Sequence, residues 1–188
     1  MYNLLIFVIL MNHSLFIEFP REIAKISTNL KIKCFGSKDC GLSYRTIGHY
    51  QELKIIGSED KRNKTWVKFS GVEIVWIRII IQLRNLGISL EKVKKLHYQL
   101  FESGKLGSID KIQFISNSFE HEIALVILKK YDLNLIIFSD FSYTFQDSQT
   151  TRQQHVKMIR RDSFINIPLT PIILKVYSET KEKLQSTK

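Results

Sequence analysis

The stretch from Ser70 to Leu86 restricts the possible folds of this chain most strongly, because it predicts one helix that must be buried on most sides. Ser70 and Glu73 have the spacing of a capping box, which satisfies the first free N–H groups of a helix. Apolar residues then occupy almost every position, and the remaining polar stripe consists of Arg78, Gln82 and Asn85. Such a helix needs neighbours around it, and we expect burial of Ile77, Ile81 and Leu83.

A shorter helix is predicted upstream, at Tyr44–Leu53. Ser43 can cap it, and neighbouring elements must hold it, because an isolated helix of this length is unstable in water. Arg45 and His49 are four residues apart and therefore project from one face. The residues expected on the inward side are Ile47 and Tyr50, although Tyr50 also fits a surface contact.

Between these two helices lies a basic loop that is followed by a short β-wing. Residues 57–64 (GSEDKRNK) are polar and end in basic residues, and residues 66–69 (WVKF) have the composition of a small wing. Gly87 then ends the long helix, and Ser89 caps a third helix whose apolar residues recur at helical spacing through Phe101. The predicted order is helix, wing, helix, helix.

These residues resemble the DNA-binding domains of the MerR-like winged helix-turn-helix transcription regulators. The matching strings are SYRTIGHYQEL at residues 43–53, KR at 61–62, WVKFS at 66–70 and LRNLGISLEKV at 83–93. The resemblance covers residues 41–101 and extends back through residues 20–28, which resemble that family's first helix. It implies a winged-helix domain at residues 20–102, with an insertion at residues 29–40 where the family has almost no spacer.

The resemblance implies sequence-specific binding of double-stranded DNA for transcription regulation, through the helix at residues 44–53 and the wing at residues 61–69. The candidate DNA contacts are Ser43, Tyr44, Arg45, Thr46, His49, Tyr50, Arg62, Lys64 and Lys68. It also implies a homodimer on a pseudo-palindromic promoter site, with RNA polymerase as a further partner. The formal net charge of +10 agrees, because cationic side chains near phosphates release condensed counterions.

Two residues depart from the family pattern and leave other functions open. Gly48 stands where the family usually has a DNA-contacting arginine, and Val67 stands at the position of the wing arginine. One alternative is an accessory recombination factor similar to the excisionases, which use a small winged fold to bend DNA. The other alternative is a protein-interaction adaptor whose winged helix does not read DNA.

Nothing in the sequence indicates an enzyme, a metal site or a cofactor. It contains no glycine-rich phosphate loop, nucleophile elbow or HExxH string. Glu120, His121 and Glu122 are consecutive, and on a helix they diverge by about 100° per residue, so they cannot bind one ion together. Cys34 and Cys40 are too few for a disulfide scaffold or a structural zinc site, and reduced thiols indicate a cytoplasmic protein.

The two ends of the chain give less information. Residues 1–19 are predicted to be an apolar N-terminal extension, whose run at residues 4–11 is far short of the ~20 residues that span a bilayer, so no membrane partner is expected. Residues 103–108 are predicted to be a linker, and residues 109–188 a small α+β domain for dimerisation, sensing or partner contact. Its expected elements are strands at 109–115, 133–138, 141–145 and 163–169, and two helices whose N-caps are Ser118 and Thr170. The predicted fold class is therefore α+β.

Overall fold

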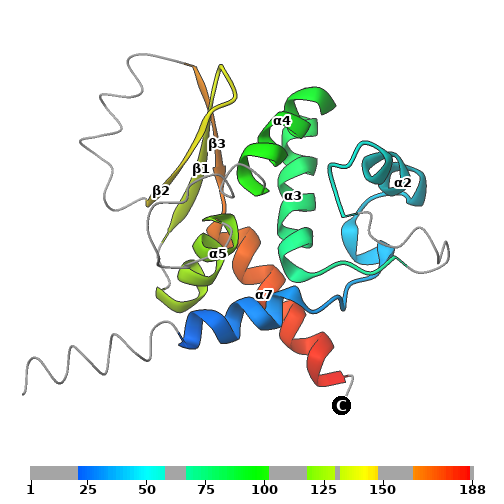
Figure 1. Ribbon diagram of the computed structural model, residues 1–188, viewed down its shortest axis with the longest axis vertical. Coiled ribbons are helices and arrows are strands. Elements are labelled where there is room, and N and C mark those ends of the chain that lie inside the picture. Colours follow the sequence, from blue (N-terminus) through cyan, green and yellow to red (C-terminus); the bar gives the residue numbers. More distant parts are fainter. Residues whose placement is uncertain (1–20, 58–66, 102–117, 130–131, 148–162, 187–188) are drawn as a thin grey trace, which may run out of the picture.

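The computed structural model describes residues 21–57, 67–101, 118–129, 132–147 and 163–186. Within these residues an N-terminal helical part is combined with a C-terminal part that contains a three-stranded antiparallel sheet and helices, which confirms the predicted α+β class (Figure 1). The predicted N-terminal extension, the linker and the strand at 109–115 lie outside the described residues. The division of the chain into domains stays a prediction.

In the N-terminal part, the described residues form five helical segments. They are a helix at residues 21–31, the 3₁₀ helix η1 (Ser37–Cys40), and the α-helices α2 (Tyr44–Glu52), α3 (Gly71–Asn85) and α4 (Leu90–Phe101). The bounds of α2, α3 and α4 agree closely with the sequence prediction. Each has the expected capping serine: the Ser43, Ser70 and Ser89 hydroxyls accept backbone N–H groups of Thr46, Glu73 and Lys92.

Helix α3 forms the centre of the core, as its apolar sequence predicts. The capping box at its start is present, since the Ser70 N–H also donates to the Glu73 carboxylate at 2.7 Å. Ile77 and Leu83 are fully buried. The expectation for Ile81 was wrong in degree, because this side chain is only half-buried. It is one helical turn from Arg78 and borders the polar stripe.

The C-terminal part consists of α5 (Ser118–Lys129), β1 (Leu133–Phe138), β2 (Tyr143–Asp147), β3 (Phe164–Pro168) and α7 (Thr170–Ser186). The sheet has the order β2-β1-β3, and β1 pairs with both neighbours antiparallel. At the middle of this sheet Leu135 lies opposite Phe145 on one side and Ile167 on the other. A hydrogen bond joins the start of α7 to the sheet: the Leu133 N–H on β1 donates to the Thr170 hydroxyl at 2.7 Å.

The strand predicted at residues 141–145 was placed two residues too early. In the structure, β2 is Tyr143–Asp147. The Asp140 carboxylate accepts the Ser142 N–H at 2.8 Å and the Ser142 hydroxyl at 2.6 Å, and Phe141 has a positive φ of 66°. These bonds make residues 139–142 the turn of the hairpin, so Phe141 belongs to the turn although it is buried.

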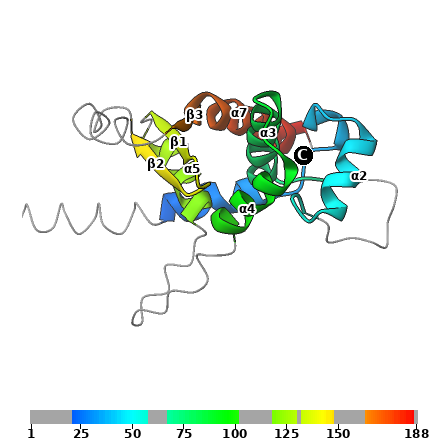
Figure 2. The same cartoon turned by 90° about the horizontal axis from the view of Figure 1, so that it is seen from above.

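The two parts share one hydrophobic core. Buried residues of α3 and α4 continue without a break into those of α5, β1 and α7, and α3 packs directly against α7. In two perpendicular views, α2 and the sheet lie at opposite ends of the molecule, with α3 and α4 between them (Figures 1 and 2). Helix α3 is therefore covered by the N-terminal helices on one side and by the C-terminal part on the other.

Candidate nucleic-acid interface

Helix α2 is short and is held in place mainly by its neighbours. Ile47 is 1% exposed and Tyr50 6% exposed, and both belong to the common core. Just beyond the helix, the buried indole N–H of Trp76 on α3 donates to the Ile55 carbonyl at 2.8 Å. This bond satisfies a polar group inside the core and fixes the end of α2 against α3.

The opposite face of α2 is open to solvent. Tyr44 is 62% exposed, and Arg45 and His49 are also exposed. His49 lies one helical turn after Arg45, so both side chains project from the same face, as their spacing predicts. This face therefore presents a guanidinium and an imidazole, and the exposed phenol of Tyr44 lies beside it at the start of the helix. All three groups donate hydrogen bonds to phosphates and base edges.

The hydroxyl groups at the start of α2 form hydrogen bonds within the helix terminus. The Ser43 hydroxyl accepts the Thr46 N–H at 3.1 Å, and it lies 2.7 Å from the Thr46 hydroxyl. Both residues are among the predicted DNA contacts, and Ser43 is exposed while Thr46 is half-buried. Their bonds to each other give them a clear role in starting the helix, whatever else they contact.

Tyr50 is a predicted contact whose side chain points into the protein. Sequence reasoning left it open whether this residue contacts DNA or packs in the core. Its side chain is 6% exposed and belongs to the common core, as the core alternative expects. The reason is helical phase: Tyr50 follows Ile47 by three residues and therefore shares its inward face.

The described part of the wing is joined to the segment before η1. Phe35 and Phe69 are both fully buried and exchange two backbone hydrogen bonds, of 3.1 and 2.8 Å. Lys68 precedes Phe69 and is exposed. The predicted contacts Arg62 and Lys64 lie outside the described residues. Residues 29–40, which the sequence suggested as an insertion, thus supply Phe35 as the β-bridge partner of Phe69.

Further charged residues flank α2, and sequence reasoning did not single them out. Lys38 lies in η1 and Lys54 follows α2, where it has a positive φ of 56°, and both are exposed. Glu52 is exposed on the same side as His49 and Arg45, at helical spacing from both. Glu52 lies within the matching string at residues 43–53, whereas Lys38 and Lys54 belong to no motif that could have identified them.

Gly48 leaves a gap in the exposed face of α2. Apart from its chain neighbours and the backbone of α2 itself, a Cβ atom added there would have no atom within 4 Å, so a side chain at this position would extend into solvent. The residue lies at helical spacing between Arg45 and Glu52. The missing side chain is therefore a local property of this surface and not a requirement of packing.

Of the two cysteines, Cys40 is buried and Cys34 is half-buried. Burial raises the pKa of Cys34, and burial together with the nearby carboxylates of Asp39 and Glu73 raises the pKa of Cys40 to about 12. The Cys40 thiol donates to the Gly36 carbonyl, with Sγ 3.6 Å from the oxygen. Within the described residues, no three His, Cys, Asp or Glu side chains gather as metal ligands, and no helix has the length and apolar character of a membrane span.

Comparison with known proteins assigns one region of the chain. A family model described as MerR HTH family regulatory protein matches residues 37–100. The match begins at η1 and includes α2, α3 and nearly all of α4. These residues are a MerR helix-turn-helix domain, which indicates DNA-binding transcriptional regulation, and the rest of the chain is unassigned. Neither the curated proteins nor the solved structures gave a match.

Proposed function

We propose that the MerR helix-turn-helix domain at residues 37–100 makes this protein a sequence-specific DNA-binding transcription regulator. The observation that carries the proposal is the exposed face of α2, where Tyr44, Arg45 and His49 stand on a helix whose other face is fixed in the core. In this proposal α2 enters the major groove. Arg45 is the leading candidate for base contact, because a guanidinium can bond a guanine edge through two N–H groups.

The wing and the residues beside α2 would contact the phosphates. Lys68 and Lys54 are exposed, and the predicted contacts Arg62 and Lys64 complete the proposed set. Phosphate contacts position a protein on DNA and make binding depend on salt, whereas base contacts choose the sequence. We further propose a homodimer, because MerR-like regulators are expected on pseudo-palindromic sites, with RNA polymerase as a partner at the promoter.

An adaptor that does not bind DNA is the second candidate, and two observations favour it. Gly48 leaves the exposed face of α2 without a side chain at its centre, and Glu52 places a negative charge on that face. A carboxylate opposes the approach of phosphates. A polar protein partner would tolerate both features.

Binding selection from random double-stranded DNA, followed by sequencing, tests these alternatives with the full-length chain. Enrichment of a palindrome supports the regulator and its homodimer. Clustered direct sites would instead favour a DNA-bending recombination factor. If no sequence is enriched and the residual binding hardly depends on salt, the DNA-binding proposal is wrong and the adaptor is favoured.

The substitution Gly48→Arg offers a gain-of-function test. The position is open, and arginine has a higher helix propensity than glycine, so the variant should fold at least as stably as the unmodified protein. If α2 faces DNA, the new cation should tighten binding to duplex DNA and steepen its salt dependence by about one unit. Gly48→Gln is the control without charge. Unchanged DNA affinity for both variants would place this face away from the duplex.

A further inference from the structure

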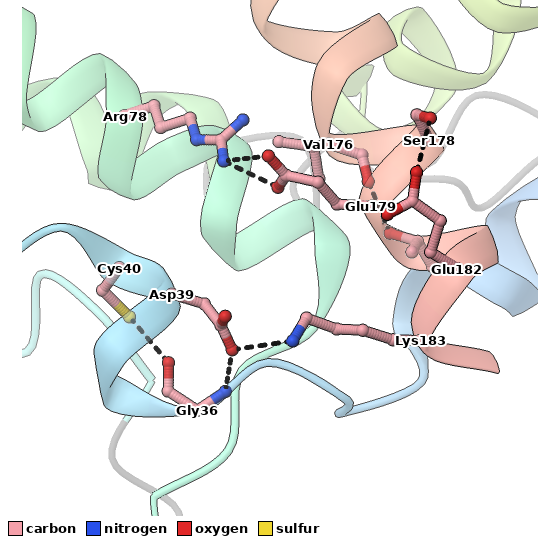
Figure 3. Close-up of polar contacts among 10 residues, drawn as sticks. Gly36, Asp39, Cys40, Arg78, Val176, Ser178, Glu179, Glu182 and Lys183 are labelled. Atoms are coloured by element: carbon pink, nitrogen blue, oxygen red, sulfur yellow. Dashed lines mark hydrogen bonds and ion pairs between the residues drawn. The ribbon is translucent and has the colours of Figure 1, made fainter. Parts of the chain in front are cut away.

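The C-terminal helix α7 contacts the helix-turn-helix domain through two charged groups. Glu179 accepts two hydrogen bonds from Arg78 on α3, of 3.0 and 2.7 Å (Figure 3). One turn further along α7, the Lys183 ammonium lies 3.1 Å from the Asp39 carboxylate of η1. The two contacts join α7 to two different elements of the domain, and α7 itself lies outside the residues that the family model matches.

Asp39 lies where the chain leads into α2. Its carboxylate accepts the Gly36 N–H at 2.7 Å, which closes the η1 turn, and the same oxygen faces Lys183 (Figure 3). Gly41 then ends η1 with a positive φ of 69°, and Ser43 caps α2. Because only two residues separate η1 from this cap, a displacement of η1 moves the start of α2.

The same ammonium group also reaches the base of the wing. Lys183 Nζ lies 5.4 Å from the centroid of the Phe35 ring, a distance at which a cation is attracted to an aromatic face. Phe35 is fully buried, and its backbone pairs with Phe69 at the base of the wing. Lys183 therefore touches both segments that support the proposed DNA contacts, one leading to α2 and one joined to the wing.

Close packing against the start of α3 fixes the position of α7 relative to these segments. A Cβ atom added to Gly71, the first residue of α3, would lie 3.1 Å from the Thr180 hydroxyl and 2.8 Å from Leu30 Cδ2. Thr180 is 1% exposed and donates its hydroxyl to the Val176 carbonyl at 2.8 Å. Since Lys183 follows Thr180 by one turn of the same helix, this contact with α3 fixes where the ammonium group stands.

We infer that Lys183 is a positioning residue for DNA binding, which sets the wing and α2 relative to each other through Phe35 and Asp39. This inference rests on the proposed function. Without the charge of Lys183, the η1 segment and the base of the wing are held less firmly. DNA binding must then order these two segments, and this ordering weakens the affinity. Lys183 is not itself a phosphate contact in this account, because its ammonium group already faces Asp39.

The test measures the affinity of full-length variants for the duplex obtained by selection, at several salt concentrations. Lys183→Met keeps most of the aliphatic side chain, and Asp39→Asn keeps an acceptor for the Gly36 N–H. Each should bind about fivefold more weakly, with an unchanged salt slope, and the double variant should bind no more weakly than either single variant. Lys175→Met removes an exposed lysine from the same helix and is the matched control, with unchanged affinity.

Amide hydrogen exchange without DNA supplies an independent readout. In Lys183→Met the amides of Phe35 and Phe69 should exchange faster, whereas those in the middle of α3 should not change. Unchanged exchange together with unchanged affinity would overturn the inference. A salt slope that becomes shallower by about one unit would also overturn it, because Lys183 would then contact a phosphate directly.

Failure of the proposed function is distinguishable from failure of this inference. If the unmodified protein selects no DNA sequence, the function fails and a DNA-positioning role for Lys183 fails with it. If the unmodified protein binds its selected site and both charge-removing variants bind equally well, the function stands and only the inference is wrong.

Discussion

Helix α2 buries two side chains, Ile47 and Tyr50, whereas α3 is buried along most of its fifteen residues. The two helices belong to the same matched domain, yet they depend on different interactions. Helix α3 carries enough apolar surface to organise the core by itself, with neighbours on opposite sides. Helix α2 is too short to be stable alone and is fixed by the core through its inner face. Its outer face is consequently free of packing demands.

Because of this difference, substitutions in α3 and in α2 should have different consequences. A change in the buried face of α3 should affect stability first and DNA binding only through unfolding. A change on the outer face of α2 should affect binding and leave stability nearly unchanged, because surface substitutions away from caps and close contacts have small effects. The predictions below test this separation, beginning with the largest expected effect.

The substitution Ile77→Asp should unfold the protein. Ile77 is fully buried in α3 and has no cationic partner, so the carboxylate would be buried unpaired, at a cost of roughly 4 kcal/mol or more. Ile81→Asp is the internal comparison, because its half-buried side chain borders the polar stripe and the carboxylate can reach water. Thermal unfolding followed by circular dichroism should show a much smaller loss for Ile81→Asp. Equal losses would contradict the assigned exposure of these two positions.

Two glycine substitutions should change stability in opposite directions. Gly71→Ala places a methyl group 2.8 Å from Leu30 Cδ2 and 3.1 Å from the Thr180 hydroxyl, and such overpacking costs about 1–3 kcal/mol. Gly48→Ala meets no atom within 4 Å outside the backbone of its own helix and its chain neighbours, and it removes a glycine from a helix, so it should stabilise by about 0.5–1 kcal/mol. Urea denaturation of both variants measures the contrast. If Gly71→Ala is as stable as the unmodified protein, α7 does not approach α3 as closely as described.

The smallest predicted effect concerns pH and the hairpin turn of the C-terminal part. The hydrogen bond from the Ser142 hydroxyl, followed by that from its backbone N–H, lowers the pKa of Asp140. A carboxylate with a lowered folded-state pKa stabilises the protein above its unfolded-state pKa, near 3.9, and this contribution disappears as the pH falls through the folded-state pKa. Asp140→Asn should therefore lower Tm slightly at pH 7, and the difference from the unmodified protein should shrink below pH 4. A difference that does not depend on pH would exclude the charge of Asp140 as its cause.

The sequence could predict the helices of the matched domain because their signals are local. The capping serines and the apolar periodicity of α3 each lie within a few residues of the feature that they determine. The strand β2 was misplaced because the turn before it depends on the Asp140 and Ser142 side chains and on a positive φ at Phe141, an unusual conformation for a phenylalanine. Hydrophobic pattern alone cannot find such a turn.

The candidate site was predictable in part for the same reason. Helical phase was sufficient to place Arg45 and His49 on an outer face and Ile47 on an inner one. It could not show that residues 29–40 supply Phe35 as the partner of Phe69, because that pair joins segments far apart in the sequence. It also gave no sign that Lys183, near the end of the described chain, contacts the segment that leads into α2.

The central claim is that the outer face of α2 reads DNA while its inner face only fixes the helix. The most direct test compares Arg45→Ala and Arg45→Lys on the duplex selected by the unmodified protein and on an unrelated duplex. Both variants should melt as the unmodified protein does, because Arg45 is exposed. Arg45→Ala should lose affinity for the selected site, and Arg45→Lys should lose about 1–3 kcal/mol of discrimination while keeping its affinity for unrelated DNA. Binding of Arg45→Ala to the selected site as tightly as the unmodified protein would contradict the assignment of α2 as the reading element.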